Sequence, residues 1–179
     1  MELSLRTLRV ADIDNDFVLW HQNNDGHLDY YTGSRRSFSE EELNEWISTA
    51  ELSNTYFYLI IAGDKHPIGT VKIGPIDQKN KTSDLACLIG KREYLGKGLA
   101  SRIIAMANET AFVEHDIRRL QSGMFEENIP SIKAYCRAGW QIEGRMRGYY
   151  WVDEKPMDRI CVACFNPKYF PNEIKNEDK

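Results

Sequence analysis

A glycine-containing junction between an apolar segment and a long amphipathic segment constrains the fold of this chain more than any other feature. Residues 84–90, which include LACLIG, are predicted as a strand, whereas residues 97–115 carry apolar side chains at helical spacing. Between them lies LGKGLA, residues 95–100. Glycine lets the backbone approach a ligand, and the first turn of a helix offers unpaired N–H groups and a positive dipole end. The junction suits a phosphate or pyrophosphate, although a plain strand–helix turn would show the same residues and neither the P-loop nor the G-x-G-x-x-G pattern is present.

The remaining segments read as strands and helices without strict alternation. Ser39 and Glu42 form a capping box at the start of one predicted helix, and Asp12 is the predicted N-cap of an earlier one. Gly139 is typical of the residue that follows a helix, here one over 128–138. Strands are predicted over residues 3–10, 56–62, 68–73, 84–90, 120–125, 140–147 and 156–165. The predicted fold class is therefore α/β (α+β), with one mixed, largely antiparallel sheet flanked by helices on both faces.

Length and composition indicate one globular domain. The chain has 179 residues, of which 42% are apolar and 28% charged, and both fractions are typical of globular proteins. We divide it into a domain over residues 1–165 and a loosely ordered C-terminal tail over 166–179, where the sequence becomes polar. A net charge of −4 provides no basic field for nucleic acid. The longest apolar run, Tyr56–Ala62, is far shorter than the ~20 residues that span a bilayer, so no membrane association is expected.

The N-terminus and the cysteines favour a cytoplasmic protein. MELSLRTLRV lacks the apolar core of a signal peptide. Cys161 and Cys164 lie in an apolar stretch predicted as a strand, on which residues three apart face opposite sides. Because this arrangement is unsuited to joint metal ligation, we expect no metal and free thiols, in keeping with a reducing compartment.

A second group of polar residues follows about thirty residues after the glycine junction. Asn128, Ser131 and Tyr135 are spaced i, i+3 and i+7, which places them on one face of the predicted helix. Each also has a purely structural interpretation: Asn128 as N-cap, Ser131 in the first turn, and Tyr135 as a half-buried ring. The spacing alone does not decide between these interpretations and a binding site.

Together, the two groups resemble the GNAT superfamily of acyl-CoA-dependent N-acyltransferases. The family pattern is Q/R-x-x-G-x-G/A followed by N-x-x-S/A-x-x-x-Y-x-x-x-G-F/W. Here the two stretches read LGKGLA (residues 95–100) and NIPSIKAYCRAGW (residues 128–140), and the likeness extends over nearly the whole body of the chain. Leu95 departs from the family's Gln or Arg, so the resemblance implies pyrophosphate binding through backbone N–H groups rather than through this side chain.

The resemblance implies that acetyl-CoA is the co-substrate and assigns residues to it. By this resemblance, the strand end that receives the pantetheine arm corresponds to Ile89, Gly90 and Lys91. The loop that binds the pyrophosphate corresponds to Leu95, Gly96, Lys97, Gly98, Leu99 and Ala100, and the helix contacts to the CoA arm correspond to Asn128 and Ser131. Tyr135 is implied to point at the thiol. The polar loop over 21–36 and the C-terminal segment are similar to the RimJ/RimL-type and spermidine acetyltransferase branches, which acetylate peptide α-amines, polyamines or amino sugars.

Acyl transfer to an amine requires a neutral nucleophile and an acid for the departing thiolate. Tyrosine carries its proton at neutral pH, so Tyr135 is the candidate acid. Many relatives use a glutamate as base, but QSGMF, residues 121–125, contains none. Asp84 and His27 are the candidates that remain, together with a water chain to solvent.

The acceptor is expected between the loop over 21–36 and the turn over 147–155, and the candidate substrate-binding residues in the loop are His27, Tyr30 and Tyr31. Acidic residues in and after the loop suit a cationic amine; they are Asp25, Asp29 and residues 40–42. Basic residues suit a phosphorylated or nucleotide-linked amine; they are Arg35, Arg36, Arg145 and Arg147. We predict an N-acetyltransferase that is a monomer or a homodimer and that acts by direct attack on a small-molecule or peptide amine in a ternary complex. The alternatives are a non-catalytic acyl-CoA-binding sensor or partner domain, and an RNA-directed acetylating toxin, against which the net charge argues.

Overall fold

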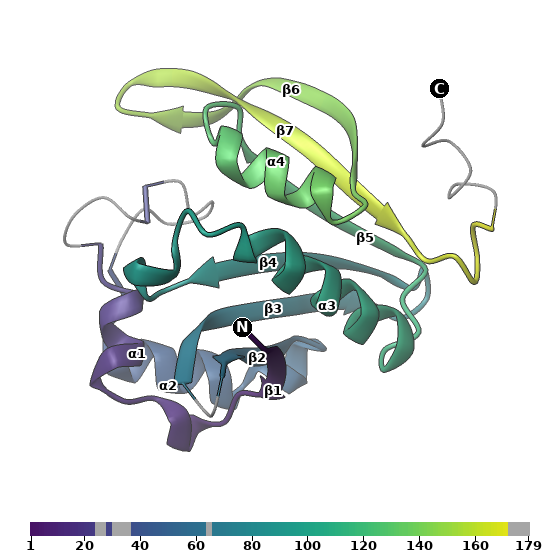
Figure 1. Cartoon of the computed structure of the whole chain (residues 1–179). Helices are drawn as coiled ribbons and strands as arrows, with labels where there is room; N and C mark the ends of the chain where they lie inside the picture. Colours follow the sequence, from purple (N-terminus) through teal and green to yellow (C-terminus); the bar gives the residue numbers. More distant parts are fainter. Residues whose placement is uncertain (24–27, 30–36, 64–65, 172–179) are drawn as a thin grey trace.

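The described residues of the computed structural model are 1–23, 28–29, 37–63 and 66–171, and they form one seven-stranded sheet (Figure 1). The strand order is β1-β2-β3-β4-β5-β7-β6. Every neighbouring pair is antiparallel except β4–β5, which is parallel. The strands are β1 (Leu3–Thr7), β2 (Tyr56–Ala62), β3 (His66–Asp77), β4 (Thr82–Ile89), β5 (Arg119–Phe125), β6 (Gln141–Val152) and β7 (Lys155–Phe165).

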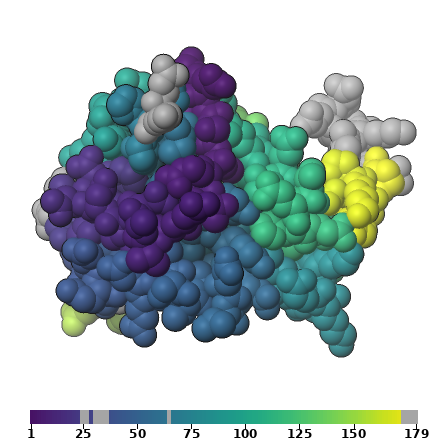
Figure 2. Space-filling model, turned by 90° about the horizontal axis from the view of Figure 1, so that it is seen from below, coloured from purple at the N-terminus to yellow at the C-terminus, as the bar shows by residue number. Residues whose placement is uncertain are grey.

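Helices cover both faces of the sheet, as the predicted fold class requires (Figure 1). The helices α1 (Asn15–Trp20) and α2 (Glu40–Ser48) lie on one face, and α3 (Leu99–Val113) and α4 (Ile129–Arg137) lie on the other. Short 3-10 turns occupy Val10–Asp12, Ala50–Ser53 and Arg92–Tyr94. In the space-filling view from below, the purple N-terminal residues lie against the blue segment that contains β2, with which β1 pairs (Figure 2).

The two apolar cores follow from the period-2 alternation of the strands. On β2, Tyr58 and Ile60 pack into the core beneath α3 and α4, whereas Phe57 and Leu59 pack into the core beneath α1 and α2. Because successive side chains on a strand face opposite sides, the apolar run of β2 serves both layers at once. Complete burial of such a side chain stabilises the fold by about 1.5–3 kcal/mol.

The helix starts are set by local side-chain caps. The predicted capping box of α2 is confirmed: the Ser39 N–H donates to Glu42 at 2.8 Å and the Glu42 N–H donates to the Ser39 hydroxyl at 3.2 Å. The predicted N-cap of the preceding helix is wrong, because Asp14 caps α1 by accepting from the Phe17 N–H at 2.8 Å. Asp12 instead lies in the 3-10 turn, where Arg6 holds its carboxylate at 2.7 Å.

Strand β3 is longer than the predicted residues 68–73. It begins before Pro67, which lies opposite Ile61 at a register shift between Ile60 and Ile61, where a missing ladder donor is tolerated. A second register shift lies between Ile73 and Ile76 in the pairing with β4. The apolar pattern predicted residues 68–73 of this strand correctly, but it did not predict the residues at either end, where the register shifts occur.

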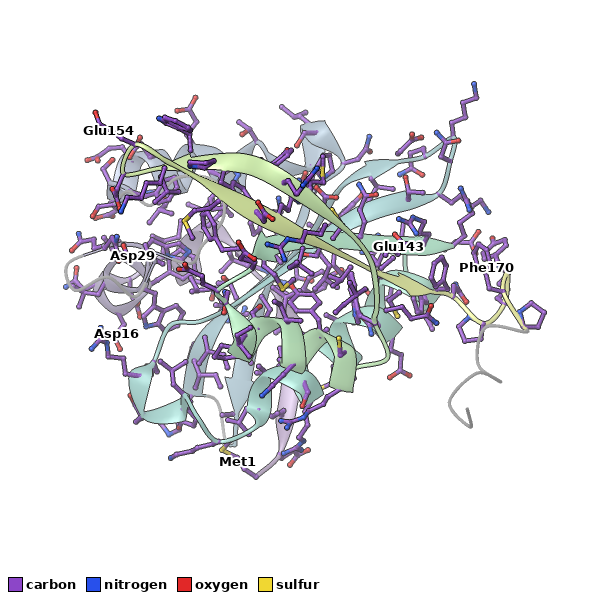
Figure 3. All side chains as sticks on the ribbon, turned by 90° about the horizontal axis from the view of Figure 1, so that it is seen from above. Met1, Asp16, Asp29, Glu143, Glu154 and Phe170 are labelled. Atoms are coloured by element: carbon purple, nitrogen blue, oxygen red, sulfur yellow. The ribbon has the colours of Figure 1, made fainter. Side chains whose placement is uncertain are left out.

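The molecule has two distinguishable ends along the strands (Figure 3). Phe170 lies at one end, and Asp16, Asp29 and Glu154 lie at the other. Because Phe165 pairs with Arg119 at the start of β5, the chain that leaves β7 emerges at the Phe170 end. The opposite end carries the β6–β7 hairpin tip and the C-terminus of β4.

Candidate active site

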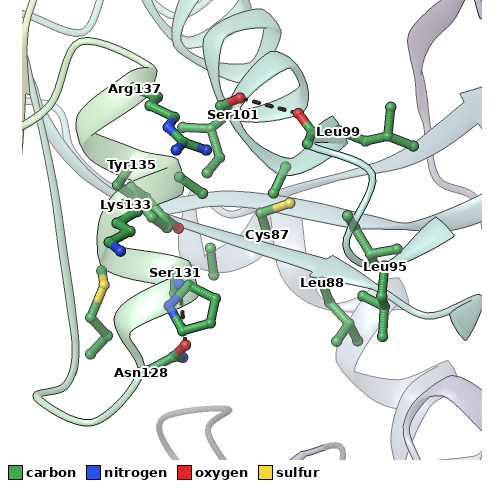
Figure 4. A pocket seen from close by; sticks show the side chains of 18 of the residues that line it. Cys87, Leu88, Leu95, Leu99, Ser101, Asn128, Ser131, Lys133, Tyr135 and Arg137 are labelled. Atoms are coloured by element: carbon green, nitrogen blue, oxygen red, sulfur yellow. Dashed lines mark hydrogen bonds between the residues drawn. The ribbon is translucent and has the colours of Figure 1, made fainter.

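The parallel pair β4–β5 is short, and this shortness creates the site. The two strands are paired only over Thr82–Arg119, Ser83–Leu120 and Asp84–Gln121. Beyond these pairs a cavity of about 560 Å³ opens (Figure 4). It is lined by residues 86–89 of β4 and Gly90 after it, by residues 122–124 of β5, by the start of α3, and by α4. Cavities of 300–1,000 Å³ are typical of small-molecule and cofactor sites.

The glycine junction forms one rim of this cavity. Gly96 and Gly98 have φ angles of +71° and +70°, which lie in the left-handed region that favours glycine. Gly98 is also the N-cap of α3, and no side chain caps this helix start. The N–H groups of the first turn are therefore available to a ligand, and an anion is stabilised there by those donors and by the helix dipole.

The opposite rim is the face of α4. Asn128 caps this helix, with its side-chain oxygen accepting from the Ser131 N–H at 3.2 Å (Figure 4). The cap leaves the Asn128 amide NH2 for a ligand, so the structural and the binding interpretations of this residue are compatible. Lys133 and Arg137, one turn apart on α4, also line the cavity and add positive charge.

Tyr135 occupies the space between the diverging strands. Its side chain is buried, and its hydroxyl donates to the carbonyl of Leu85, the first β4 residue beyond the paired segment, at 3.2 Å. The ring meets Trp140 edge-on, with centroids 4.8 Å apart. Figure 4 shows this side chain extending from α4 toward β4. The hydroxyl is thus held at a defined position in the cavity rather than turned to solvent.

A buried amide fixes the two helices that flank the cavity. Asn108 of α3 donates to the carbonyl of Ala138, just after α4, at 3.0 Å, and it accepts from the indole N–H of Trp140 at 3.0 Å. Trp140 in turn supports the Tyr135 ring. Because a buried amide is costly unless it is hydrogen-bonded, these bonds favour one arrangement of α3 and α4. Nothing in the sequence pattern singled out Asn108.

The cavity also contains one thiol. Cys87 lines it from β4, and burial raises the pKa of this thiol to about 12. The thiolate is the nucleophilic form of cysteine, so Cys87 remains protonated and unreactive at neutral pH. In the CVAC pair, both cysteines lie on β7 as predicted, and Cys164 packs into the core beneath α3 and α4.

Most of the residues expected to contact the cofactor line this cavity. They are Ile89, Gly90, Leu95, Gly96, Gly98, Leu99, Ala100, Asn128 and Ser131, together with the candidate acid Tyr135. Lys91 and Lys97 are not among the lining residues: the Lys91 ammonium pairs with Asp16 at 3.2 Å, and that of Lys97 lies 5.6 Å from the centroid of the Tyr94 ring.

Of the two candidates for the base, only Asp84 lies within the described residues. Asp84 does not line the cavity; it ends the paired segment of β4 and faces away from the core that contains Leu85. His27 lies outside the described residues, as do Tyr30 and Tyr31. Sequence reasoning missed Lys133 and Arg137, although their i, i+4 spacing on the helix of Asn128 was a usable signal.

Two further classes of feature concern metals and membranes. Across the described ranges, no three His, Cys, Asp or Glu side chains come together in a group that could hold a metal ion. None of the helices in those ranges is long and apolar enough to cross a membrane.

Known proteins are similar to this chain in sequence and in fold. The acetyltransferase (GNAT) domain family matches residues 2–141. An uncharacterized N-acetyltransferase of the SPbeta prophage of Bacillus subtilis (strain 168) is 23% identical over 161 residues, which cover 90% of this chain and 88% of the relative. The spermidine N(1)-acetyltransferase of Escherichia coli (strain K12) is 22% identical over 148 residues, 79% of each chain.

A solved structure gives the fold-level match. The spermidine N-acetyltransferase of Vibrio cholerae, in complex with CoA and spermine, aligns with a TM-score of 0.81 at 20% identity, over 94% of this chain and 98% of that one. The family match spans more than half of the chain and includes both the glycine junction and α4. The chain therefore belongs to the GNAT acetyltransferase family and is an acetyl-CoA-dependent N-acetyltransferase.

Proposed function

We propose that the cavity between β4 and β5 holds acetyl-CoA and that Tyr135 is the acid that protonates the departing thiolate. The observation that carries this proposal is the position of the Tyr135 hydroxyl, which lies in the gap between the diverging strands and in the same cavity as the glycine rim. The pyrophosphate binds the N–H groups at the start of α3, and Lys133 and Arg137 contribute positive charge from α4. The arm that bears the thioester runs between the strands toward Tyr135.

The reaction is a direct attack. The amine nitrogen forms a bond to the thioester carbonyl carbon, the carbon–sulfur bond breaks, and the amine loses a proton to a base or to water. The Tyr135 hydroxyl exchanges the Leu85 carbonyl for the sulfur and passes its proton to the thiolate. Solvent then restores that proton. Asp84 is the proposed base, acting through water because it lies outside the cavity lining.

An acyl-enzyme on Cys87 is the competing route, and the raised pKa of this thiol argues against it. Initial rates of thiol release, with acetyl-CoA and an amine both varied, separate the two routes. Direct attack predicts intersecting double-reciprocal lines and no acetylated protein by mass spectrometry. Parallel lines, together with protein that gains an acetyl group in the absence of amine, would contradict the proposal.

We propose that the acceptor is a small-molecule amine. The relatives named above include enzymes that act on spermidine. The same thiol-release measurement across a panel of spermidine, simple alkylamines, amino acids and a short peptide tests this class. Saturable release with small amines is the expected result, and release with the peptide alone would contradict it.

A further inference from the structure

Arg159 lies beside the opening between β4 and β5, on the face of the sheet opposite α3 and α4. On β7, Ile160 and Val162 pack into the core beneath those helices, so Arg159 points to the other face. Its partner in the ladder is Phe125 of β5. The arginine is thus placed on the side of the sheet that the glycine rim and α4 do not cover.

The guanidinium of Arg159 packs directly against the backbone of Gly123. A Cβ atom built on Gly123 would overlap the Nε, Cζ and Nη2 atoms of Arg159. Gly123 also lines the cavity, so only the backbone of one residue separates the cavity from the guanidinium. The absence of a side chain at this position is what permits the approach.

The donors of Arg159 are not used by a protein carboxylate within the described residues. Its Nε is buried and has no hydrogen-bond partner there, and the Tyr149 ring lies on the guanidinium, with 5.0 Å between Cζ and the ring centroid. The neighbouring Arg145, by contrast, forms ion pairs with Glu126 and Asp158. An arginine fork that is packed in place but has no carboxylate is ready to receive one from a ligand.

The side of the approach follows from the proposed function, on which this inference rests. With the coenzyme on the α3 and α4 side of the opening, the amine reaches the thioester from the opposite side of the sheet. We propose that Arg159 binds a carboxylate on the acceptor amine, so that the acceptors are amino acids or related amino carboxylates. A planar carboxylate matches the guanidinium in charge and shape. A polyamine would instead bring a second cation beside Arg159.

Matched acceptors of equal chain length test this selectivity. We would measure kcat/KM for ω-amino carboxylates of two to six carbons, each beside the n-alkylamine and the α,ω-diamine of the same length. In the wild type, the best carboxylate should exceed its neutral partner by roughly tenfold or more, the ratio that 1.4 kcal/mol represents. An aminoalkylphosphonate of similar length distinguishes a carboxylate site from a general anion site, and a preference for it would overturn the choice of carboxylate.

Substitution of Arg159 then links the selectivity to this side chain. Arg159→Gln should bring the carboxylate-to-neutral ratio near one while acetyl-CoA affinity, measured by calorimetry, is retained. Arg159→Lys should keep only part of the ratio, because it retains the charge without the planar fork. Lys79→Gln is the matched control: it removes a positive charge from the exposed turn between β3 and β4, which the site does not include, and should leave the ratio unchanged.

The outcomes separate this inference from the proposed function. If alkylamines or diamines support thiol release as well as or better than the carboxylates, the acetyltransferase assignment of the site stands and the Arg159 inference is wrong. An unchanged ratio in Arg159→Gln is equally contrary to it. If no amine in either panel supports thiol release, both the proposed acceptor class and this inference fail.

Discussion

The two ends of the β4–β5 pair are held in opposite ways. At the end that we call the paired end, the strands are joined by three residue pairs and by ion pairs around Asp116. At the open end, no ladder joins residues 86–90 to residues 122–124, and the cavity lies between them. One parallel pair of strands is thus tightly held at one end and leaves room for a ligand at the other.

The paired end is stabilised by ion pairs and hydrogen bonds, several of which come from the residues that follow β7. We call this group of contacts the clamp. Asp116 accepts from the Lys81 ammonium, from the Lys168 ammonium at 2.6 Å and from the Tyr169 hydroxyl at 2.9 Å. Asn166 adds a bond from its side-chain amide to the carbonyl of Ile117 at 2.7 Å. The first residues of the proposed C-terminal tail therefore contribute to this end, and the tail boundary at 166 stays a prediction.

The open end is held apart by packing instead. Tyr135 spans the gap and donates a hydrogen bond to the carbonyl of Leu85. Its ring packs against Trp140, whose indole N–H donates to Asn108. The paired end fixes the relative position of β4 and β5, and for this reason the strands can separate at the open end and leave backbone groups for a ligand. Substitutions at the open end should change binding or chemistry, and those at the paired end should change stability alone.

The largest expected effect is that of Tyr135→Phe at the open end. The variant keeps the ring packed against Trp140 and removes the hydroxyl proton. General acid catalysis contributes typically ~10²–10⁴-fold, so kcat should fall by that range while acetyl-CoA affinity changes by only a few-fold. Steady-state kinetics on the best acceptor, with a melting curve as the folding control, measures this. A folded variant with near-normal kcat, under conditions in which chemistry limits the rate, would reduce Tyr135 to a packing residue.

A smaller effect is expected from Gly98→Val at the glycine rim. Valine resists the positive φ of Gly98 and places a branched side chain where the pyrophosphate is proposed to bind. Because this side chain would compete with the ligand for the rim, acetyl-CoA affinity should weaken by about tenfold or more, the ratio that about 1.4 kcal/mol represents. Calorimetric titration of the folded variant measures it.

Gly63→Val is the matched control for Gly98→Val. Gly63 has a φ of +58° and, like Gly98, open space where a Cβ atom would lie, but it follows β2 in the turn toward β3 and does not line the cavity. The Gly63→Val variant should lose thermal stability through the same backbone strain and keep its acetyl-CoA affinity. Equal affinity losses in the two variants would mean that strain, rather than the rim, explains the result.

The smallest effect is expected from Asp116→Asn at the paired end. Hydrogen bonds from Lys168, Lys81 and Tyr169 lower the pKa of Asp116, so its contribution to stability is present above the pKa of the unfolded chain, about 3.9, and is lost as the pH falls toward the lower folded value. The variant should melt slightly below the wild type at neutral pH, and the difference should shrink below about pH 4. The kcat at neutral pH should be unchanged. A large loss of kcat without a loss of stability would show that the paired end acts on the chemistry.

Local patterns predicted the fold well because they act over a few residues. The capping box of Ser39 and Glu42 and the full length of β2 were predicted correctly. The misplaced N-cap shows the limit of such reasoning: Asp12 and Asp14 are equally good caps by residue type, and the ion pair with Arg6, a residue of β1, decides between them. The irregular ends of β3 depend in the same way on pairing with other strands.

The glycine rim and the polar face of α4 could be predicted from the sequence, because a left-handed glycine, a helix N-terminus and an i, i+3, i+7 face are properties of short segments. The contacts across the opening between β4 and β5 depend instead on tertiary packing. Tyr135 reaches Leu85 and Arg159 crosses Gly123 because the β4–β5 ladder stops after three pairs and β7 lies beside β5. Such contacts join residues tens of positions apart, and they follow from strand register and packing, which no local periodicity specifies.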